Sequence, residues 1–395
     1  MASPLRIMHI STRLILGGSQ ENTVLSCEGQ ADHGHAVSLV FGPIFGPEGS
    51  MLDRVKAHGG IEAIETPNMV RELAPLKDFR CGRELRAIIR EWKPDVVHTH
   101  SSKAGILGRS AAWKEKVPCI VHTIHGLAFH PYMSKWRNAI YIASEKFAAK
   151  RCHVIACVAD AMRDQALAKG IGKPSQYITV YSGMEVERYV KPAWERDRVR
   201  KELGLSGGDF VLGTVARLAE LKGHDDLLDA LEALMKARPT LKLMWVGDGW
   251  WADRLLGRVK DLGLADRVIA TGLVPSEEIP KYLQAMDVLA HPSYREGLPR
   301  TVTQALLSAT PVIAYDVDGT REVCLDGETG KLVKPGDLTM LREATEWMME
   351  HPGKRQEMGR RGQELCKDRF AASRMVEHLE SIYADVLEHP RKWAP

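Results

Sequence analysis

The chain has 395 residues, 44% of them hydrophobic, and its 54 basic and 51 acidic side chains give a formal net charge of +3. This length exceeds what one ordinary hydrophobic core supports, so we expect two domains, each able to bury a core of its own. The nearly even charge balance argues against nucleic acid as the main partner, because duplex-binding domains usually carry a strong basic excess.

Apolar runs of strand length alternate with amphipathic segments of helix length. In the first half, the pattern predicts strands at 5–10, 36–41, 96–100, 119–123, 154–158 and 177–181, and helices at 21–33, 50–58, 78–92, 104–113, 135–151 and 160–169. In the second half, it predicts strands at 210–215, 242–246, 267–271, 288–291 and 312–315, helices at 223–237, 250–262, 276–285 and 300–308, and a last helix at about 371–387.

These two series predict an α/β protein with parallel sheets. Because the pattern stops and restarts, we expect two doubly wound, Rossmann-like domains. A charged stretch at 191–201 separates the series and is the best linker candidate. A single closed barrel is the alternative, and the charged break argues against one continuous sheet.

The seven cysteines are odd in number and include no Cys-x-x-Cys pair. This disfavours disulfides and fits a reducing cytoplasm. The first apolar run, at 7–10, is too short for a secretory signal, and no run approaches the roughly 20 apolar residues of a membrane span. We therefore expect a cytoplasmic protein that is soluble or peripheral at the inner face of the membrane.

Loops that follow strands carry most of the functional evidence, because ligands of open parallel sheets bind beyond the carboxyl ends of the strands. Gly17 and Gly18 follow the first strand and precede a helix, where backbone amides can approach a phosphate or a sugar. A plain tight turn is the alternative. Arg217 and Lys222 follow the strand at 210–215 and can neutralise a diphosphate leaving group, with a solvated basic loop as the alternative.

A second candidate loop follows the predicted strand at 288–291 and precedes the predicted helix at 300–308. Glu296 lies in this loop and Gln304 on the helix. Between them, Gly297 and Leu298 offer backbone amides at a helix N-terminus, which suits phosphate, while a helix cap is the alternative role of Glu296. His125 ends a strand directly before a glycine; a lone histidine is more often structural, but this position favours a site.

Together these motifs resemble the retaining glycosyltransferases of family 4, which have the GT-B fold. The matching stretches follow the family's order along nearly the whole chain: 17–20, 96–104, 123–126, 215–217 with 222–224, 246–249, 296–299 and 318–322. The resemblance implies two Rossmann-like domains that face a central cleft. It assigns acceptor binding to 1–190 and nucleotide-sugar binding to 191–370, and it has a helix in 371–395 cross back to the first domain.

The resemblance also implies residue roles. Arg217 and Lys222 would hold the donor's diphosphate. Glu296 would hydrogen-bond the donor sugar's hydroxyls, and His125 would contact the transferred sugar near its reacting carbon. These four are the expected catalytic residues. The expected donor-binding residues are Gly17, Gly18, Gly272, Val274, Gly297, Leu298, Pro299 and Gln304. Family members usually carry a glutamate in place of Gln304, whose carboxamide keeps hydrogen bonds but not the charge.

The implied activity is metal-independent transfer of a hexose, with retention, from a nucleotide-diphosphate sugar to a hydroxyl acceptor. A UDP-sugar is the favoured donor, no cofactor is expected, and the acceptor is a sugar, a lipid-linked sugar or a small molecule. This is chemistry of polysaccharide or glycoconjugate biosynthesis, carried by positioning and charge stabilisation. Asp316-Val317-Asp318 has the letters of a metal-binding D-x-D pair but lies within a family motif, so we expect no metal.

Two other functions are compatible with the same sequence. A sugar-nucleotide 2-epimerase shares the fold and needs no acceptor, and a non-catalytic nucleotide-binding scaffold is suggested by Gln304. The helix at 135–151 places basic residues beside aromatic and apolar ones, which is compatible with a peripheral contact with anionic lipid. Its alternative is a helix packed on its own sheet with a solvated basic face.

Overall fold

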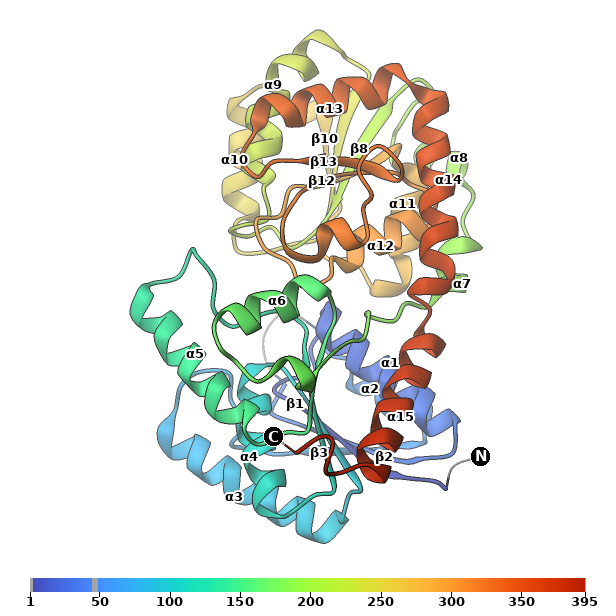
Figure 1. The fold of residues 1–395 in the computed structure, drawn as a ribbon. Coiled ribbons are helices and arrows are strands. Elements are labelled where there is room, and N and C mark those ends of the chain that lie inside the picture. Colours follow the sequence, from blue (N-terminus) through green and yellow to red (C-terminus); the bar gives the residue numbers. More distant parts are fainter. Residues whose placement is uncertain (1–2, 45–48, 395) are drawn as a thin grey trace. The chain divides into compact units, whose positions relative to one another are not determined.

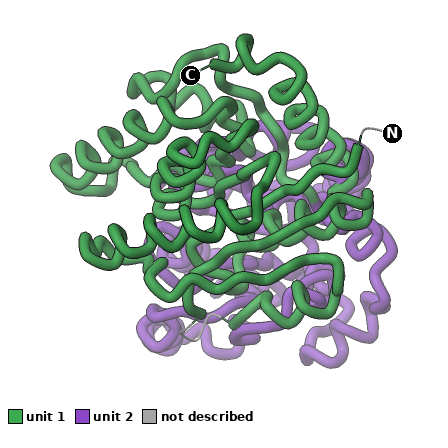
Figure 2. The backbone as a smooth tube through the Cα atoms, turned by 90° about the horizontal axis from the view of Figure 1, so that it is seen from below, with its two compact units in different colours: residues 1–183, 372–395 green, residues 184–371 purple. Residues whose placement is uncertain are grey.

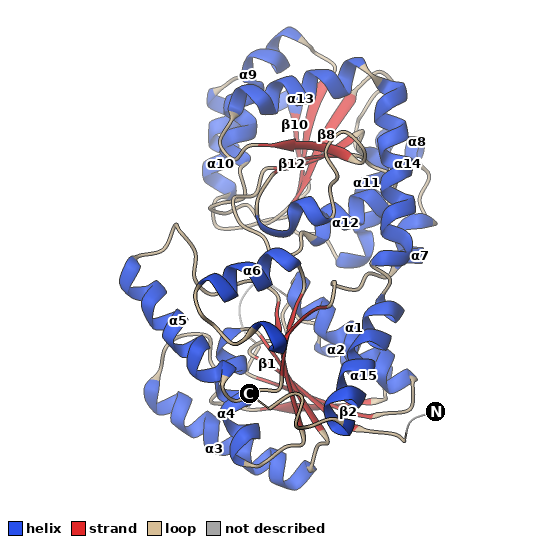
Figure 3. Cartoon of the chain, in the orientation of Figure 1, coloured by secondary structure: helices blue, strands red, loops and turns tan. Residues whose placement is uncertain are grey.

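The computed structural model describes residues 3–44 and 49–394. The chain divides into two compact units (Figure 2): unit 1 is Met1–Gly183 with Ala372–Pro395, and unit 2 is Met184–Ala371. In each unit, a sheet lies in the centre and helices lie around it (Figure 3). The predicted class, an α/β protein with two doubly wound domains, is confirmed, and the single closed barrel is excluded.

Unit 1 (Figure 1) is built on a parallel sheet. Its described strands follow the order β3-β2-β1-β4-β5-β6-β7. The strands are β1 (Arg6–Ser11), β2 (Ala36–Phe41), β3 (Ile61–Glu65), β4 (Val96–His100), β5 (Cys119–Ile124), β6 (Val154–Cys157) and β7 (Tyr177–Thr179). The helices are α1 (Gly18–Asp32), α2 (Leu52–His58), α3 (Pro75–Trp92), α4 (Ser102–Lys114), α5 (Lys135–Ala149), α6 (Asp160–Ala168), the short η1 (Pro174–Gln176) and α15 (Ala372–Glu388). The central strands are buried throughout, as expected when helices cover both faces of a parallel sheet.

The last helix, α15, belongs to unit 1 and packs beside α1. Its buried residues Leu379 and Ile382 share one core cluster with Ile7 of β1. A Cβ at Gly29 of α1 would lie 2.6 Å from a methyl carbon of Val376, so a glycine here lets the two helices approach closely. Residues from the far end of the chain therefore complete the core of the first unit.

Unit 2 repeats the same plan, with the described strand order β10-β9-β8-β11-β12-β13. The strands are β8 (Phe210–Val215), β9 (Leu241–Val246), β10 (Val268–Ala270), β11 (Val288–His291), β12 (Val312–Tyr315) and β13 (Gly330–Val333). The helices are α7 (Val186–Val190), α8 (Arg196–Glu202), α9 (His224–Ala237), α10 (Ala252–Asp261), η2 (Ala265–Arg267), η3 (Ser276–Glu278), α11 (Ile279–Ala285), α12 (Arg300–Leu307), η4 (Asp318–Glu322), α13 (Leu338–Glu350) and α14 (Pro352–Arg369). Both sheets reverse their strand order once, between β1 and β4 and between β8 and β11.

The boundary between the units differs from the expected linker. The charged stretch 191–201 lies within unit 2, and the chain leaves unit 1 after Gly183 and returns after Ala371 instead of at 190 and 370. Two of its arginines are held within unit 2: Arg196 Nη2 lies 2.9 Å from Asp287 Oδ1, and Arg200 is buried. These two arginines hold α8 against the start of β11, although Lys191 and Arg198 of the same stretch are exposed.

Several elements lie outside the predicted series, among them the short helices α7 and α8. The strands β3 and β13 stand at sheet edges, where residues such as Glu62 and Lys331 interrupt the apolar pattern. The helices α13 and α14 were also not expected, and α14 carries glycines that normally weaken a helix. A Cβ at Gly359 would overlap the carbonyl oxygen of Ala309, so this glycine serves close packing. None of the helices in the described ranges combines the length and hydropathy needed to cross a bilayer.

Candidate functional site

Most of the predicted site residues lie where the strand order of unit 2 reverses. Ligands of doubly wound sheets bind at this switch point, beyond the carboxyl ends of the strands. Lys222 lies in the loop after β8, and Glu296 lies in the loop after β11. Because β8 and β11 pair directly and run parallel, the two loops leave the sheet side by side.

A partly buried ion pair joins these two loops. The Lys222 ammonium donates to Glu296 Oε1 at 2.8 Å, and His291 Nε2 lies 3.1 Å from the same oxygen. The Glu296 side chain is 14% exposed and that of Lys222 is 30% exposed. Burial alone would raise the pKa of Glu296, but Lys222 and His291 outweigh it and hold this pKa well below its usual range. Glu296 is therefore an anion held in a defined position.

Backbone contacts hold the same loops together. Leu221 has φ +62°, and its carbonyl oxygen accepts from Tyr294 N at 2.9 Å. Gly223 has φ +72°, and a Cβ there would overlap the carbonyl oxygen of Pro292. A left-handed backbone at a non-glycine residue persists only where its surroundings hold it. The loop that carries Lys222 is thus a rigid support.

Asp318 fastens the loop of Glu296 from the other side, a role that the sequence analysis missed. Its Oδ2 accepts from Glu296 N at 2.8 Å, and Gly319 N donates to Gly297 O at 3.2 Å. His291 was also missed, because it lies within the apolar strand β11 and looks like a core residue. The sequence could have indicated both residues by their position, because His291 ends β11 and Asp318 follows β12, next to the switch point.

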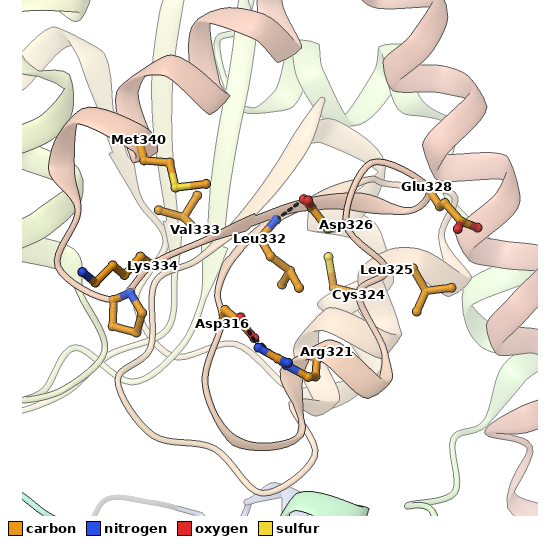
Figure 4. Close-up of a pocket in the computed structure, with 11 residues that line it drawn as sticks. Asp316, Arg321, Cys324, Leu325, Asp326, Glu328, Leu332, Val333, Lys334 and Met340 are labelled. Atoms are coloured by element: carbon orange, nitrogen blue, oxygen red, sulfur yellow. Dashed lines mark hydrogen bonds and ion pairs between the residues drawn. The ribbon is translucent and has the colours of Figure 1, made fainter.

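A recess of about 660 Å³ adjoins the 316–321 segment of unit 2, and none of the predicted site residues line it (Figure 4). Asp316 points toward Arg321 at its wall, with Nε–Oδ1 at 2.9 Å and a second contact between Nη2 and Oδ2. Leu332 N donates to Asp326 Oδ1 at 2.9 Å. The first aspartate of the D-x-D letters is therefore taken up by an internal ion pair.

Gly272 and Val274 follow β10, at the far side of the same sheet edge. Gly247 N donates to Gly272 O at 3.0 Å, and Leu218 N donates to Asp248 O at 3.1 Å. The loops after β10, β9 and β8 are therefore linked in the order of their strands. Val274 is half-buried.

Arg217 shares a loop with Lys222 but has different surroundings. Its side chain is exposed, and its guanidinium carbon lies 5.5 Å from the centroid of a Trp250 ring. The Trp250 indole N–H donates to Glu220 Oε2 at 2.8 Å. Lys222 is anchored by a mostly buried carboxylate, whereas Arg217 lies against an aromatic side chain that is itself 64% exposed.

The segment before α12 differs slightly from its expected geometry. Pro299 is the N-cap of α12, so Gly297 and Leu298 lie just before the helix rather than in its first turn. Leu298 is buried, and Gln304 is buried on α12. The structure thus brings Glu296, Gly297, Leu298 and Pro299 to the switch point of unit 2, with Gln304 on the helix behind them.

Gly17, Gly18 and His125 belong to unit 1. Gly17 is the extended N-cap residue of α1, and its carbonyl oxygen accepts from Glu21 N at 2.9 Å. His125 follows β5, and its Nε2 lies 3.0 Å from His100 Nδ1. The sequence suggested a lone histidine, but His125 lies at the end of a group of imidazoles.

A doubly wound sheet with a buried carboxylate and a lysine at its switch point is a site suited to a phosphorylated ligand. Two family models match this chain: "Glycosyl transferases group 1" over residues 195–365 and "Glycosyl transferase 4-like domain" over residues 17–183. The chain therefore belongs to the family 4 type of glycosyltransferases.

Named relatives agree with this assignment. The UDP-Gal:alpha-D-GlcNAc-diphosphoundecaprenol alpha-1,3-galactosyltransferase of Escherichia coli is 28% identical over 339 residues, which cover 85% of this chain and 86% of that protein. The 2-deoxystreptamine glucosyltransferase of Streptomyces kanamyceticus is 29% identical over 307 residues, covering 74% of this chain and 79% of that protein.

Solved structures show the GT-B fold. Anabaena Alr3699/HepE in complex with UDP-glucose has a TM-score of 0.82 at 20% identity, covering 96% of this chain and 100% of that chain. Sucrose-phosphate synthase from Thermosynechococcus elongatus has a TM-score of 0.82 at 19% identity, covering 97% of this chain and 99% of that chain.

The left-handed backbone of Gly223 predicts a sharp cost for any side chain there. We expect Gly223→Ala to lower the free energy of unfolding by about 2 kcal/mol or more, since it combines backbone strain with an overlap against Pro292. Urea unfolding followed by circular dichroism measures this. The matched control is Gly257→Ala on α10, where a Cβ meets no neighbour, and which should stabilise the protein by about 0.5 kcal/mol. Equal stability of the two variants would contradict the account of this loop.

Buried histidines predict that mild acid destabilises the protein. Burial lowers the pKa of His9 and of His224 to about 4, from an unfolded value near 6.5. The unfolded chain therefore binds more protons between these pH values, and stability should fall as pH drops from about 6.5 to about 4, by up to roughly 1.4 kcal/mol per pH unit for each histidine. Unfolding free energies measured across this window check it.

His224 offers a control, because neither of its ring nitrogens has a hydrogen-bond partner among the described residues. His224→Phe should therefore show a shallower pH slope than the natural protein. A stability that stays level between pH 6.5 and pH 4.5 would contradict the buried, neutral state of these rings.

Proposed function

We propose that the chain is a retaining, metal-independent hexosyltransferase. It takes a hexose from a nucleotide-diphosphate sugar, with a UDP-sugar as the favoured donor, and passes it to a hydroxyl acceptor without a cofactor. The observation that carries the proposal is the Lys222–Glu296 ion pair at the switch point of unit 2. Relatives named as UDP-galactose and glucosyl transferases support the donor class.

The two charges of the pair serve opposite ends of the donor. A lysine ammonium has three N–H donors. One bonds to Glu296, and a second reaches Ser293 Oγ, which lies 3.3 Å from the nitrogen. The third N–H is left for an oxygen of the diphosphate. The Glu296 carboxylate, which cannot donate, accepts from hydroxyls of the hexose. Arg217, exposed in the same loop, adds a second positive charge for the leaving diphosphate.

The remaining donor contacts follow the same edge of the sheet. Gly297 and Leu298 precede α12 and offer backbone amides to phosphate oxygens. Gly272 and Val274 contact the base, and Gln304 offers the ribose hydroxyls a neutral carboxamide in place of a carboxylate. In unit 1, Gly17 and Gly18 approach the diphosphate or the acceptor. His125 keeps the role that the family resemblance implies, contact with the transferred sugar.

Removing either member of the ion pair tests the catalytic part. We expect Lys222→Ala and Glu296→Gln to lower sugar transfer by about 10²–10³-fold, the usual effect of losing one preorganised electrostatic group. Transfer from UDP-hexoses is assayed in excess EDTA, and NMR of the product records the anomeric configuration. The matched control is Lys236→Ala, which breaks an exposed pair with Glu232 and should leave turnover unchanged.

Three outcomes would count against the proposal. Loss of activity in EDTA would reject metal independence, and an inverted product would reject retention. Conversion of a UDP-sugar into its 2-epimer in the absence of any acceptor would instead identify an epimerase. A thermal-shift comparison of UDP, GDP and ADP sugars selects the donors for these assays.

We further infer that unit 1 contacts anionic lipid at the cytoplasmic face of a membrane, where a lipid-linked acceptor is found. Three large apolar side chains of α5 are exposed: Trp136 is 65% exposed, Ile140 45% and Phe147 49%. Their spacing puts them on one stripe of the helix. The opposite face is anchored to α4, where Arg109 Nη2 lies 2.7 Å from Glu145 Oε2.

Basic residues flank this stripe, which suits lipid more than a solvated helix face. Lys135, Lys146 and Lys150 are exposed on or just beyond α5. A second exposed apolar group, Leu76 and Phe79, lies at the start of α3. An apolar stripe beside cations is the pattern of helices that lie in a membrane interface.

Vesicle flotation tests the lipid contact. The protein should float with vesicles containing phosphatidylglycerol at low salt and stay in solution with pure phosphatidylcholine, since about 1 kcal/mol per basic residue depends on surface charge. Lys146→Glu with Lys150→Glu should abolish flotation. Lys367→Glu, an exposed site in unit 2, is the control and should float normally. Absence of binding by the natural protein at low salt would end the idea.

A further inference from the structure

A line of buried imidazoles crosses the sheet of unit 1 and ends at His125. His125 Nε2 lies 3.0 Å from His100 Nδ1, and His100 Nε2 lies 2.9 Å from His9 Nδ1. His9 Nε2 then lies 2.8 Å from Gln30 Oε1 on α1. Strand alternation puts His98 and His100 on the same face of β4, and His9 of β1 pairs in register with His98.

The line continues onto α15 and back to the sheet. Gln30 Nε2 donates to the Tyr383 hydroxyl oxygen at 3.3 Å. That hydroxyl lies 2.5 Å from His98 Nδ1, and His98 Nε2 lies 2.7 Å from Thr123 Oγ1. A residue after β5 is thus connected with groups on β4, β1, α1 and α15.

Burial keeps these rings neutral. Desolvation lowers the pKa of His9 to about 4 and holds the pKa values of His98 and His100 well below their ordinary value. A neutral imidazole has one N–H donor and one bare nitrogen that accepts. Each ring therefore donates a hydrogen bond to one neighbour and accepts one from the other, so the donors along the line all point the same way.

The carboxamide of Gln30 sets that direction. Because its NH₂ group donates to Tyr383, its carbonyl oxygen accepts from His9, which places the His9 proton on Nε2. His9 Nδ1 is then bare and accepts from His100 Nε2–H. By the same reasoning, His100 Nδ1 is bare and accepts from His125, whose proton must lie on Nε2.

A metal site is the other use that such a cluster suggests, because ligand atoms of His9, His98 and His100 lie within 4.8 Å of one another. A metal ion binds the bare lone pair of an imidazole. The ring nitrogens of these three residues already take part in the hydrogen bonds described above. An ion would have to break several of them, whereas the neutral chain is complete without it.

We propose that this chain holds His125 as an imidazole with its proton on Nε2, and that His100 and His9 are positioning residues for it. The hydrogen bond at one ring nitrogen sets the proton of the other, as second-shell bonds do for histidines in general. The consequence for sugar transfer rests on the proposed function: His125 acts with an Nδ1 that only accepts, and not as a general base at Nε2. The His125 tautomer itself is a property of the protein before any donor binds, so it does not depend on the proposed function.

NMR of ¹⁵N-histidine-labelled, full-length protein without donor reads the tautomer directly. The His125 signals are those that disappear in His125→Gln. We expect the pattern of a neutral ring protonated on Nε2. A proton on Nδ1, or a mixture of tautomers, overturns the proposal. Added Zn²⁺ should leave the signals of His9 and His98 unchanged, and a specific shift of both would overturn the neutral chain.

A pair of substitutions at His100 separates positioning from mere packing. A leucine fills the space but neither donates nor accepts, so His100→Leu should give His125 mixed tautomers and lower kcat by about tenfold or more, with little change in KM. A carboxamide donates and accepts as imidazole does, so His100→Gln should restore both readouts. An unchanged His125 tautomer in His100→Leu overturns the positioning role.

The spectrum of the natural protein decides the tautomer even where a variant does not fold. The two proposals also fail separately. If the natural protein transferred no sugar, the proposed function would be rejected while the tautomer result would stand.

Discussion

Every strand pair in the described parts of both sheets is parallel, and this constraint decides where chemistry can be placed. Parallel pairing sends all carboxyl ends of the strands to one edge, and the reversal of strand order marks one point on that edge for a ligand. In unit 2, hydrogen bonds then join the loops at this edge: Tyr294 N donates to Leu221 O, and Glu296 N donates to Asp318 Oδ2. No single loop positions the site. Strands that are distant in sequence hold it together.

The buried charge of Glu296 gives the site its electrostatic character. An ionised carboxylate taken out of water destabilises a protein by several kcal/mol unless partners compensate it, and here Lys222 and His291 do so. The charges are therefore in place before any ligand arrives, which is the condition under which electrostatic groups assist a reaction most. The pair also has a structural role, because it ties the loop after β8 to the loop after β11.

The sequence predicts this site well where position along a strand is enough, and less well where side-chain direction matters. Lys222 and Glu296 could be found because each follows an apolar strand and lies beside cations or glycines. Asp318 could not be separated from Asp316 by sequence alone: one carboxylate turns to Glu296 N and the other to Arg321, and the left-handed backbone of Asp318 decides which. The linker was misplaced for a similar reason, since charge does not reveal whether an arginine meets water or an aspartate.

The protein accommodates polar groups away from water in two ways. Ions are paired, as in Lys222–Glu296 of unit 2 and Arg109–Glu145 of unit 1, whereas the line from His125 to Thr123 in unit 1 consists of imidazoles, a carboxamide and hydroxyls. Each of these groups both donates and accepts, so a line of them has one consistent order of protons. A carboxylate within it could only accept and an ammonium could only donate, and either would reverse the order on one side. Residue chemistry alone therefore explains how a glutamine on α1 can set the proton of a histidine after β5.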